Sequence, residues 1–113
     1  MIAIELPIKT VAGLNAREHF RVRARRVRME RGAAHLSVKH KQGRPDLPVV
    51  VTMVRLSFGT LDDDNLQGAF KAIRDGVADA YSIPDNDPRI TWRYDQERCE
   101  RGKFGVRIEV VAA

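Results

Sequence analysis

The sequence predicts a small α+β domain, because segments with the alternation of β-strands flank segments with helical periodicity. We expect strands at residues 2–7, 49–58, 89–96 and 105–111, and helices at residues 15–38 and 65–80. The order is therefore β-α-β-α-β-β, with two helices. A chain of 113 residues suits one domain, which we assign to residues 1–113.

In the first half, the alternation of residues 2–6 ends near Pro7, which cannot donate a backbone hydrogen bond to a sheet. Asn15 is suited to cap the first helix, and Glu18 follows at capping-box spacing. We expect this helix to continue to about Val38. One stripe at helical spacing contains Phe20, Ala24, Val27, Arg31, Ala34 and Val38.

In the second half, the β-branched run of residues 49–58 is the clearest strand, and Gly59 ends it. The helix that follows separates an apolar side from a polar stripe. The apolar side comprises Leu66, Phe70, Ile73, Val77 and Tyr81, and the polar stripe comprises Asp64, Gly68, Lys71 and Asp75. After a turn at residues 83–88, one strand face should carry Ile90, Trp92 and Tyr94.

The charge is unevenly distributed along a basic chain of net charge +5 and pI about 9.9. Residues 1–48 hold 11 Lys/Arg and 4 Asp/Glu, whereas residues 49–113 hold 9 Lys/Arg and 11 Asp/Glu. The first helix accounts for much of the excess, with Arg17, Arg21, Arg23, Arg25, Arg26, Arg28 and Arg31. Guanidinium groups suit phosphate, so we favour a nucleic-acid contact over a plain solvent-facing surface.

Acidic residues gather in two short segments, Asp62-Asp63-Asp64-Asn65 and Asp85-Asn86-Asp87. Carboxylates on neighbouring loops are typical ligands of Mg²⁺, and a basic protein with such a site suits phosphodiester chemistry. Asp and Asn are also common in helix caps and turns, which is the competing explanation. An EF-hand is disfavoured, because its Asp-x-Asp-x-Asp-Gly spacing and its terminal Glu are absent.

Several other functions are disfavoured by composition. Cys99 is the only cysteine, so a disulfide within the chain is excluded and we treat this thiol as a bystander. His19 and His35 have no partner at metal-ligand spacing. The sequence contains no run that could cross a bilayer and no signal-peptide pattern, so we expect an intracellular protein without a membrane partner.

Together, these motifs resemble the RusA-type Holliday junction resolvases of bacteria and their prophages. The resemblance rests on Asp62-Asp63-Asp64-Asn65-Leu66, the helix with Lys71 and Asp75, and Asp85-Asn86-Asp87 before a strand. Leu14-Asn15-Ala16-Arg17 resembles the family's loop before its first helix. The resemblance covers nearly the whole chain. It implies an α+β fold with a mixed sheet, a homodimer, and a cytoplasmic location in a bacterial or phage-infected cell.

The resemblance also assigns roles to residues. Asp62, Asp64 and Asp87 would be catalytic metal ligands for Mg²⁺, with Mn²⁺ as a substitute and Asp85 competing with Asp87. Asn65 and Asp75 would support the site, and Lys71 would be the catalytic lysine. The family's lysine commonly stands four residues after the second aspartate, where this chain has Gly68. A salt bridge to Asp75 is therefore the alternative role for Lys71. For DNA contacts we expect Asn15, Arg17, Arg21, Arg25 and Arg28.

The expected function is thus Mg²⁺-dependent cleavage of branched DNA by a two-fold dimer whose symmetry matches a four-way junction. The main alternative is a non-catalytic DNA-binding protein whose aspartates are caps and turns. A nuclease with a less selective substrate range is a third hypothesis.

Overall fold

The predicted α+β architecture is confirmed by the computed structural model, which describes residues 1–11 and 19–113. Each predicted strand is present within two residues of its expected bounds, whereas the second predicted helix is divided into two. In chain order the elements are β1 (Ile2–Leu6), α1 (Phe20–Lys39), β2 (Val49–Ser57), α2 (Asp63–Ala69), α3 (Lys71–Ala80), β3 (Ile90–Arg98) and β4 (Phe104–Ala112).

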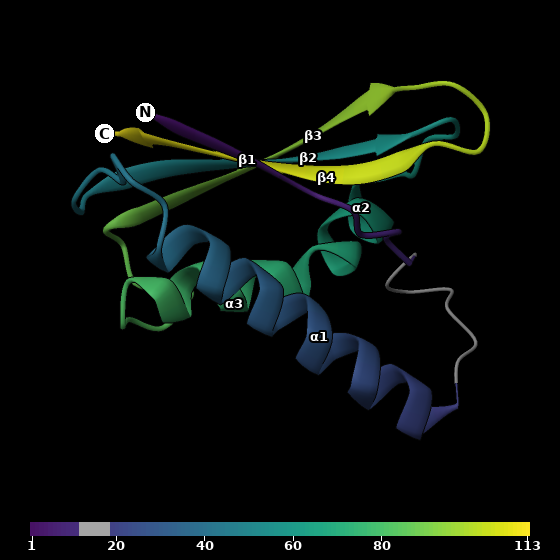
Figure 1. Cartoon of the computed structure of the whole chain (residues 1–113), viewed down its shortest axis with the longest axis horizontal. Coiled ribbons are helices and arrows are strands. Elements are labelled where there is room, and N and C mark those ends of the chain that lie inside the picture. The colour runs from purple at the N-terminus through teal and green to yellow at the C-terminus, as the bar shows by residue number, and fades with distance from the viewer. Residues whose placement is uncertain (12–18) are drawn as a thin grey trace.

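One mixed sheet of four strands forms the scaffold, in the order β1-β4-β2-β3. β4 pairs antiparallel with β1 and β2, and β2 pairs parallel with β3. A parallel pair needs a long crossover, and α2 and α3 supply it. All three helices lie on the same side of the sheet (Figure 1). The segment after β2 therefore begins at one end of the sheet, and the turn before β3 returns to the other.

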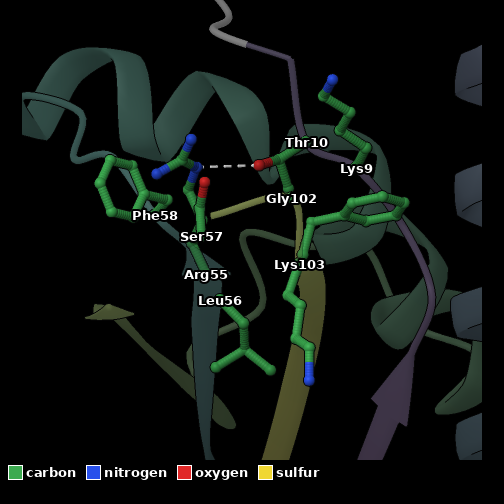
Figure 2. Close-up of a pocket in the computed structure, with 9 residues that line it drawn as sticks. Lys9, Thr10, Arg55, Leu56, Ser57, Phe58, Gly102 and Lys103 are labelled. Atoms are coloured by element: carbon green, nitrogen blue, oxygen red, sulfur yellow. Dashed lines mark hydrogen bonds between the residues drawn. The ribbon is translucent and has the colours of Figure 1, made fainter. Parts of the chain in front are cut away.

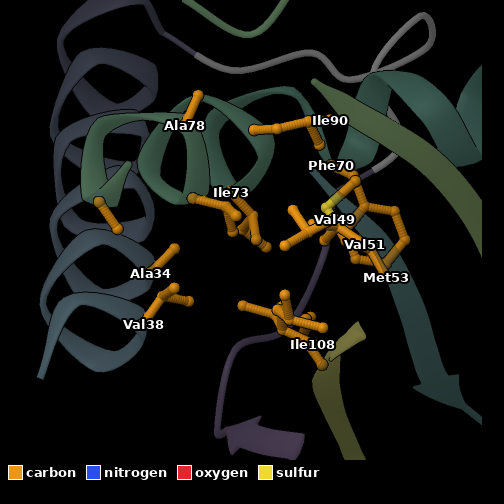
Figure 3. Packing of buried hydrophobic residues seen from close by; sticks show 14 of the residues in the cluster. Ala34, Val38, Val49, Val51, Met53, Phe70, Ile73, Ala78, Ile90 and Ile108 are labelled. Atoms are coloured by element: carbon orange, nitrogen blue, oxygen red, sulfur yellow. The ribbon is translucent and has the colours of Figure 1, made fainter. Parts of the chain in front are cut away.

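The core lies between the sheet and the helices. Alternate residues of β2 and β4 point into it, and Ala34, Val38, Ile73 and Ala78 approach from α1 and α3 (Figure 3). The apolar side predicted for the second helical stretch is confirmed, since Leu66, Phe70, Ile73 and Val77 are buried and Tyr81 packs against them.

The second helical stretch breaks at Phe70, contrary to the prediction of one continuous helix. The Phe70 N–H bonds the Gln67 carbonyl at 3.1 Å, a tighter turn than the α-helical one, and Phe70 is the boundary of both α2 and α3. Gly68, just before the break, favours helix weakly. The break places the Phe70 ring, which is fully buried, 6.1 Å from the Tyr94 ring.

The first helix begins at Phe20, later than the predicted start at Asn15. His19 is extended, and its side chain accepts a hydrogen bond from the Arg21 N–H. Asn15, Arg17 and Glu18 lie outside the described residues.

The predicted apolar stripe of α1 is correct only in its second half. Ala34 and Val38 are fully buried, whereas Phe20 is 70% exposed and Ala24 is exposed. Residues 20–25 extend past the end of α3 and are exposed, whereas Arg26 and Val27 are half-buried (Figure 1). The second half packs closely, because a Cβ at Gly76 of α3 would overlap the Arg31 carbonyl and the Ala34 methyl.

Candidate functional site

The first acidic segment forms the start of α2. Asp62 is its N-cap, and its carboxylate accepts a hydrogen bond from the Asn65 backbone N–H at 2.9 Å. The buried Asn65 side-chain amide also donates to both Asp62 oxygens, at 3.0 and 3.2 Å. Asp63 and Asp64 follow in the first turn, and both are exposed. Asp62 is therefore oriented by a neutral partner, and two further carboxylates face solvent beside it.

This segment is anchored to the sheet by residues that the sequence did not single out. Gln96 of β3 accepts from the Leu61 N–H and donates to the Leu61 carbonyl, both at 2.9 Å. Arg55 of β2 donates to the Gly59 carbonyl at 2.9 Å. Both anchors belong to the parallel strands, so Asp62–Asp64 is fixed to a rigid part of the fold.

The second acidic segment is neutralised by cations within the chain. The Asp85 carboxylate accepts from Lys71 at 3.0 Å and from Arg74 at 2.9 Å. Its backbone carbonyl accepts from the Trp92 indole N–H at 2.8 Å and from Arg74 at 3.2 Å. The hydrogen bond from Lys71 is the main reason that the pKa of Asp85 lies below its usual value.

Asp87 is held by its neighbour Arg89. The Arg89 guanidinium grips both carboxylate oxygens, at 3.0 and 2.9 Å, and the Arg89 backbone N–H donates at 2.9 Å. These bonds, led by the side-chain one, lower the pKa of Asp87 to about 2. A cation approaching Asp87 would have to compete with Arg89 for the same oxygens.

Lys71 makes the salt bridge that was its alternative role. Its ammonium donates to Asp75 at 2.9 Å as well as to Asp85, and the Asp75 hydrogen bond is the main cause that raises its pKa. The side chain is nevertheless 62% exposed, so solvent and ligands can reach it.

Lys71 also faces a groove between the basic helix and the acid-bearing helices. The groove has a volume of about 180 Å³ and includes Gly68 and Asp75 from the predicted polar stripe. Arg23 and Arg26 of α1 line its opposite side. Gly68 thus lines the groove together with Lys71, on the helix side where the resemblance would place a lysine.

The donor set fits Mg²⁺ at Asp62 and Asp64 but not as a ready-made cage. Within residues 1–11 and 19–113, no three Asp, Glu, His or Cys side chains form a group suited to a metal ion. Mg²⁺ commonly keeps several waters and takes only one or two carboxylates together with a substrate phosphate. The first acidic segment can meet that need, whereas Asp85 and Asp87 already have cationic partners.

The arginines of α1 divide into two groups. Arg31 forms a bidentate pair with Asp79 of α3, at 2.6 and 2.9 Å, and Arg26 pairs with the buried Glu30 at 3.2 Å. Arg21, Arg25 and Arg28, named as DNA contacts, are all exposed. Asn15 and Arg17, named with them, lie outside the described residues.

The structure adds Arg74 and Arg89 to the site, as partners of the second acidic segment. The signals for both are in the sequence, because Arg74 follows Lys71 by nearly one helical turn and Arg89 follows Asp87 by two residues.

No protein-family model, curated protein or solved structure matches the chain. The resemblance to RusA-type resolvases therefore rests on the residues quoted above. None of the helices in the described part of the chain has the length and apolar character needed to cross a membrane.

Proposed function

We propose that the protein is a Mg²⁺-dependent endonuclease that resolves four-way DNA junctions. The observation that carries the proposal is the groove in which Arg23 and Arg26 of α1 face Lys71 of α3. It sets the arginine-rich helix beside the helices that follow the first acidic segment. A DNA backbone bound along α1 would therefore lie close to the carboxylates of α2.

Asp62 and Asp64 are the residues that would hold Mg²⁺, and Asn65 keeps Asp62 in one orientation. Bound Mg²⁺ supplies a Lewis acid for the phosphate and lowers the pKa of a hydrolytic water. Lys71 offers positive charge to the phosphate as negative charge develops during cleavage. Asp75 and Asp85 keep that ammonium protonated and positioned, which is why its pKa is raised.

The exposed arginines of α1 would bind the duplex arms by their phosphates, at Arg21, Arg25 and Arg28. A homodimer would place two sites on opposed strands of a junction, as symmetric cutting requires. We assign this activity to the cytoplasm of a bacterial or phage-infected cell. Sedimentation should give a mass near twice 12.8 kDa.

A non-catalytic DNA-binding protein is the second candidate, and the capping geometry favours it. Asp62 acts as a helix cap, and Asp85 and Asp87 form internal ion pairs, as this alternative predicts. It leaves the exposed Asp64 without a role, whereas the nuclease proposal uses it.

The deciding experiment incubates the protein with a labelled synthetic four-way junction in Mg²⁺ or in EDTA. The nuclease proposal expects paired nicks in opposed strands with Mg²⁺ alone, and little cutting of linear duplex. Binding without nicking would support the alternative. Equal cutting of junction, flap and linear duplex would point to the less selective nuclease.

A further inference from the structure

A basic pocket lies where β2 and β4 meet at one end of the sheet, near the segment that leads to Asp62. Its volume is about 200 Å³. Among the described residues that line it, three are basic and none is acidic. The lining residues are Lys9, Thr10, Arg55, Leu56, Ser57, Phe58, Gly102, Lys103 and Phe104.

Arg55 is the fixed cation of this pocket. Its guanidinium donates to the Thr10 hydroxyl and to the Gly59 carbonyl, both at 2.9 Å, and both acceptors are neutral. Figure 2 shows the guanidinium directed at Thr10, with Phe58 on one side and Lys9 and Lys103 on the other. Burial lowers the pKa of Arg55, and among the described residues no carboxylate pairs with this guanidinium. An anion in the pocket would relieve this imbalance.

Aromatic rings lie beside these cations. The Phe58 ring has the guanidinium groups of Arg98 and Arg101 over it, 4.7 and 5.1 Å from its centroid. The Phe104 ring, also part of the pocket wall, is 49% exposed. Basic groups interleaved with exposed aromatic rings are the typical surface for single-stranded nucleic acid, because phosphates meet the cations and bases stack on the rings.

We propose that this pocket binds one unpaired nucleotide of a DNA strand, with its phosphate on Arg55 and its base stacked on Phe104. Lys103, whose exposed ammonium pairs with Glu100 at 3.6 Å and is directed away from Arg55 in Figure 2, would add positive charge for the same strand. That the bound polymer is DNA rests on the proposed function. The geometry of the pocket is observed independently of that function. Ser57 of the pocket and Asp62 are five residues apart, which limits their separation to about 17 Å. A strand opened at the junction centre could thus occupy the pocket while a nearby phosphate of the same strand lies at the acidic segment.

The test measures binding of labelled oligothymidylate and of a labelled duplex by anisotropy, in EDTA so that nothing is cut. Phe104→Ala should bind oligothymidylate about tenfold more weakly than wild type and bind duplex equally. Leu36→Ala is the matched control, because Leu36 is a similarly exposed apolar residue, at 56%, on α1. Equal binding by Phe104→Ala and Leu36→Ala would overturn the proposal.

Two further measurements separate base from phosphate. An abasic oligonucleotide should bind wild type as weakly as oligothymidylate binds Phe104→Ala. Lys103→Gln should lower the slope of log K against log salt for oligothymidylate by about 0.7, with Lys39→Gln as the unchanged control. Full affinity for the abasic strand, or an unchanged slope in Lys103→Gln, would contradict the assignment of base or phosphate.

The readout also distinguishes this proposal from the nuclease. Wild type that binds oligothymidylate through Phe104 but never nicks a junction with Mg²⁺ would sustain the pocket and refute the nuclease. Junction cutting by wild type, with normal oligothymidylate binding by Phe104→Ala, would refute the pocket and sustain the nuclease.

Discussion

The two acidic segments, residues 62–64 and 85–87, differ in what surrounds their carboxylates. At the first, Asp62 is bound by the neutral Asn65 amide, and Asp64 is exposed. At the second, Lys71, Arg74 and Arg89 supply positive charge directly to Asp85 and Asp87. Among the described residues no cation pairs with the first segment, whereas the second already has its cations.

This difference teaches that a cluster of aspartates in sequence has two distinct uses. A carboxylate with a neutral partner keeps its charge available to a ligand, and one with a guanidinium partner stabilises a loop. The second segment carries the turn before β3, and its bonds to Arg74 and Trp92 fix that turn to α3 and β3. We therefore expect variants of the first segment to affect cleavage and variants of the second to affect mainly stability.

The largest expected effect is that of Asp64→Asn. Loss of a metal ligand should slow junction cleavage by about 1,000-fold, corresponding to about 4 kcal/mol in the barrier. DNA binding should be equal or tighter, because a negative charge is removed. Asp63→Asn is the control, because Asp63 is an adjacent exposed aspartate to which no metal-binding role is assigned, and this variant should cleave the junction normally. Full activity in Asp64→Asn would remove the functional difference between the two segments.

Lys71→Met tests the residue that joins the second segment to the groove. If its ammonium stabilises developing charge on the phosphate, cleavage should fall by about 100-fold with little change in DNA affinity. Thermal unfolding should be measured in parallel, because Lys71 also pairs with Asp75 and Asp85. A lower melting temperature with normal cleavage would make Lys71 a purely structural member of the second segment.

Simultaneous replacement of Arg21, Arg25 and Arg28 by Ala tests whether DNA reaches the first segment along α1. Affinity should fall by about tenfold or more for all DNA shapes, and each lost phosphate contact should reduce the salt slope by about 0.9. The comparison is a variant in which Lys39 and Lys41 are replaced by Ala. These basic residues lie at and just beyond the other end of α1, so the salt slope of this variant should stay unchanged. An unchanged slope in the triple variant would place the DNA elsewhere.

The smallest expected effect is the loss of stability in Asp85→Asn. The carboxylate is 26% exposed, so we expect about 1 kcal/mol in the free energy of unfolding at neutral pH. Asp46→Asn, an exposed aspartate elsewhere, should change little.

The effect should also depend on pH. The pKa of Asp85 is lowered below 3.8 in the folded protein, so its stabilisation is present above that pH and lost as the pH falls. Chemical denaturation of both proteins at neutral and acid pH would measure this. If wild type and Asp85→Asn still differed in free energy of unfolding at acid pH, the ionic origin of the stabilisation would be contradicted.

Much of the fold was predictable because its signals are local. The alternation in β2 and the apolar side at Leu66, Ile73 and Val77 report burial directly, since one face of each element must meet the core. The break at Phe70 was not predictable from periodicity, because the buried residues on both sides keep helical spacing. The exposure of Phe20 depends on how far α3 extends alongside α1, which no local pattern records.

By itself, the sequence determined the element types, the basic first helix and the positions of two acidic segments, because propensity, periodicity and charge are properties of neighbouring residues. Only the tertiary structure decided the ion pairs between residues far apart in the sequence. Arg74 reaches Asp85 and Arg31 reaches Asp79 across gaps of 11 and 48 residues. The basic pocket around Arg55 likewise exists only because β4 pairs with both β1 and β2 and so brings residues 9, 55 and 103 to one end of the sheet. Such contacts follow from packing, and packing is settled by the whole chain together.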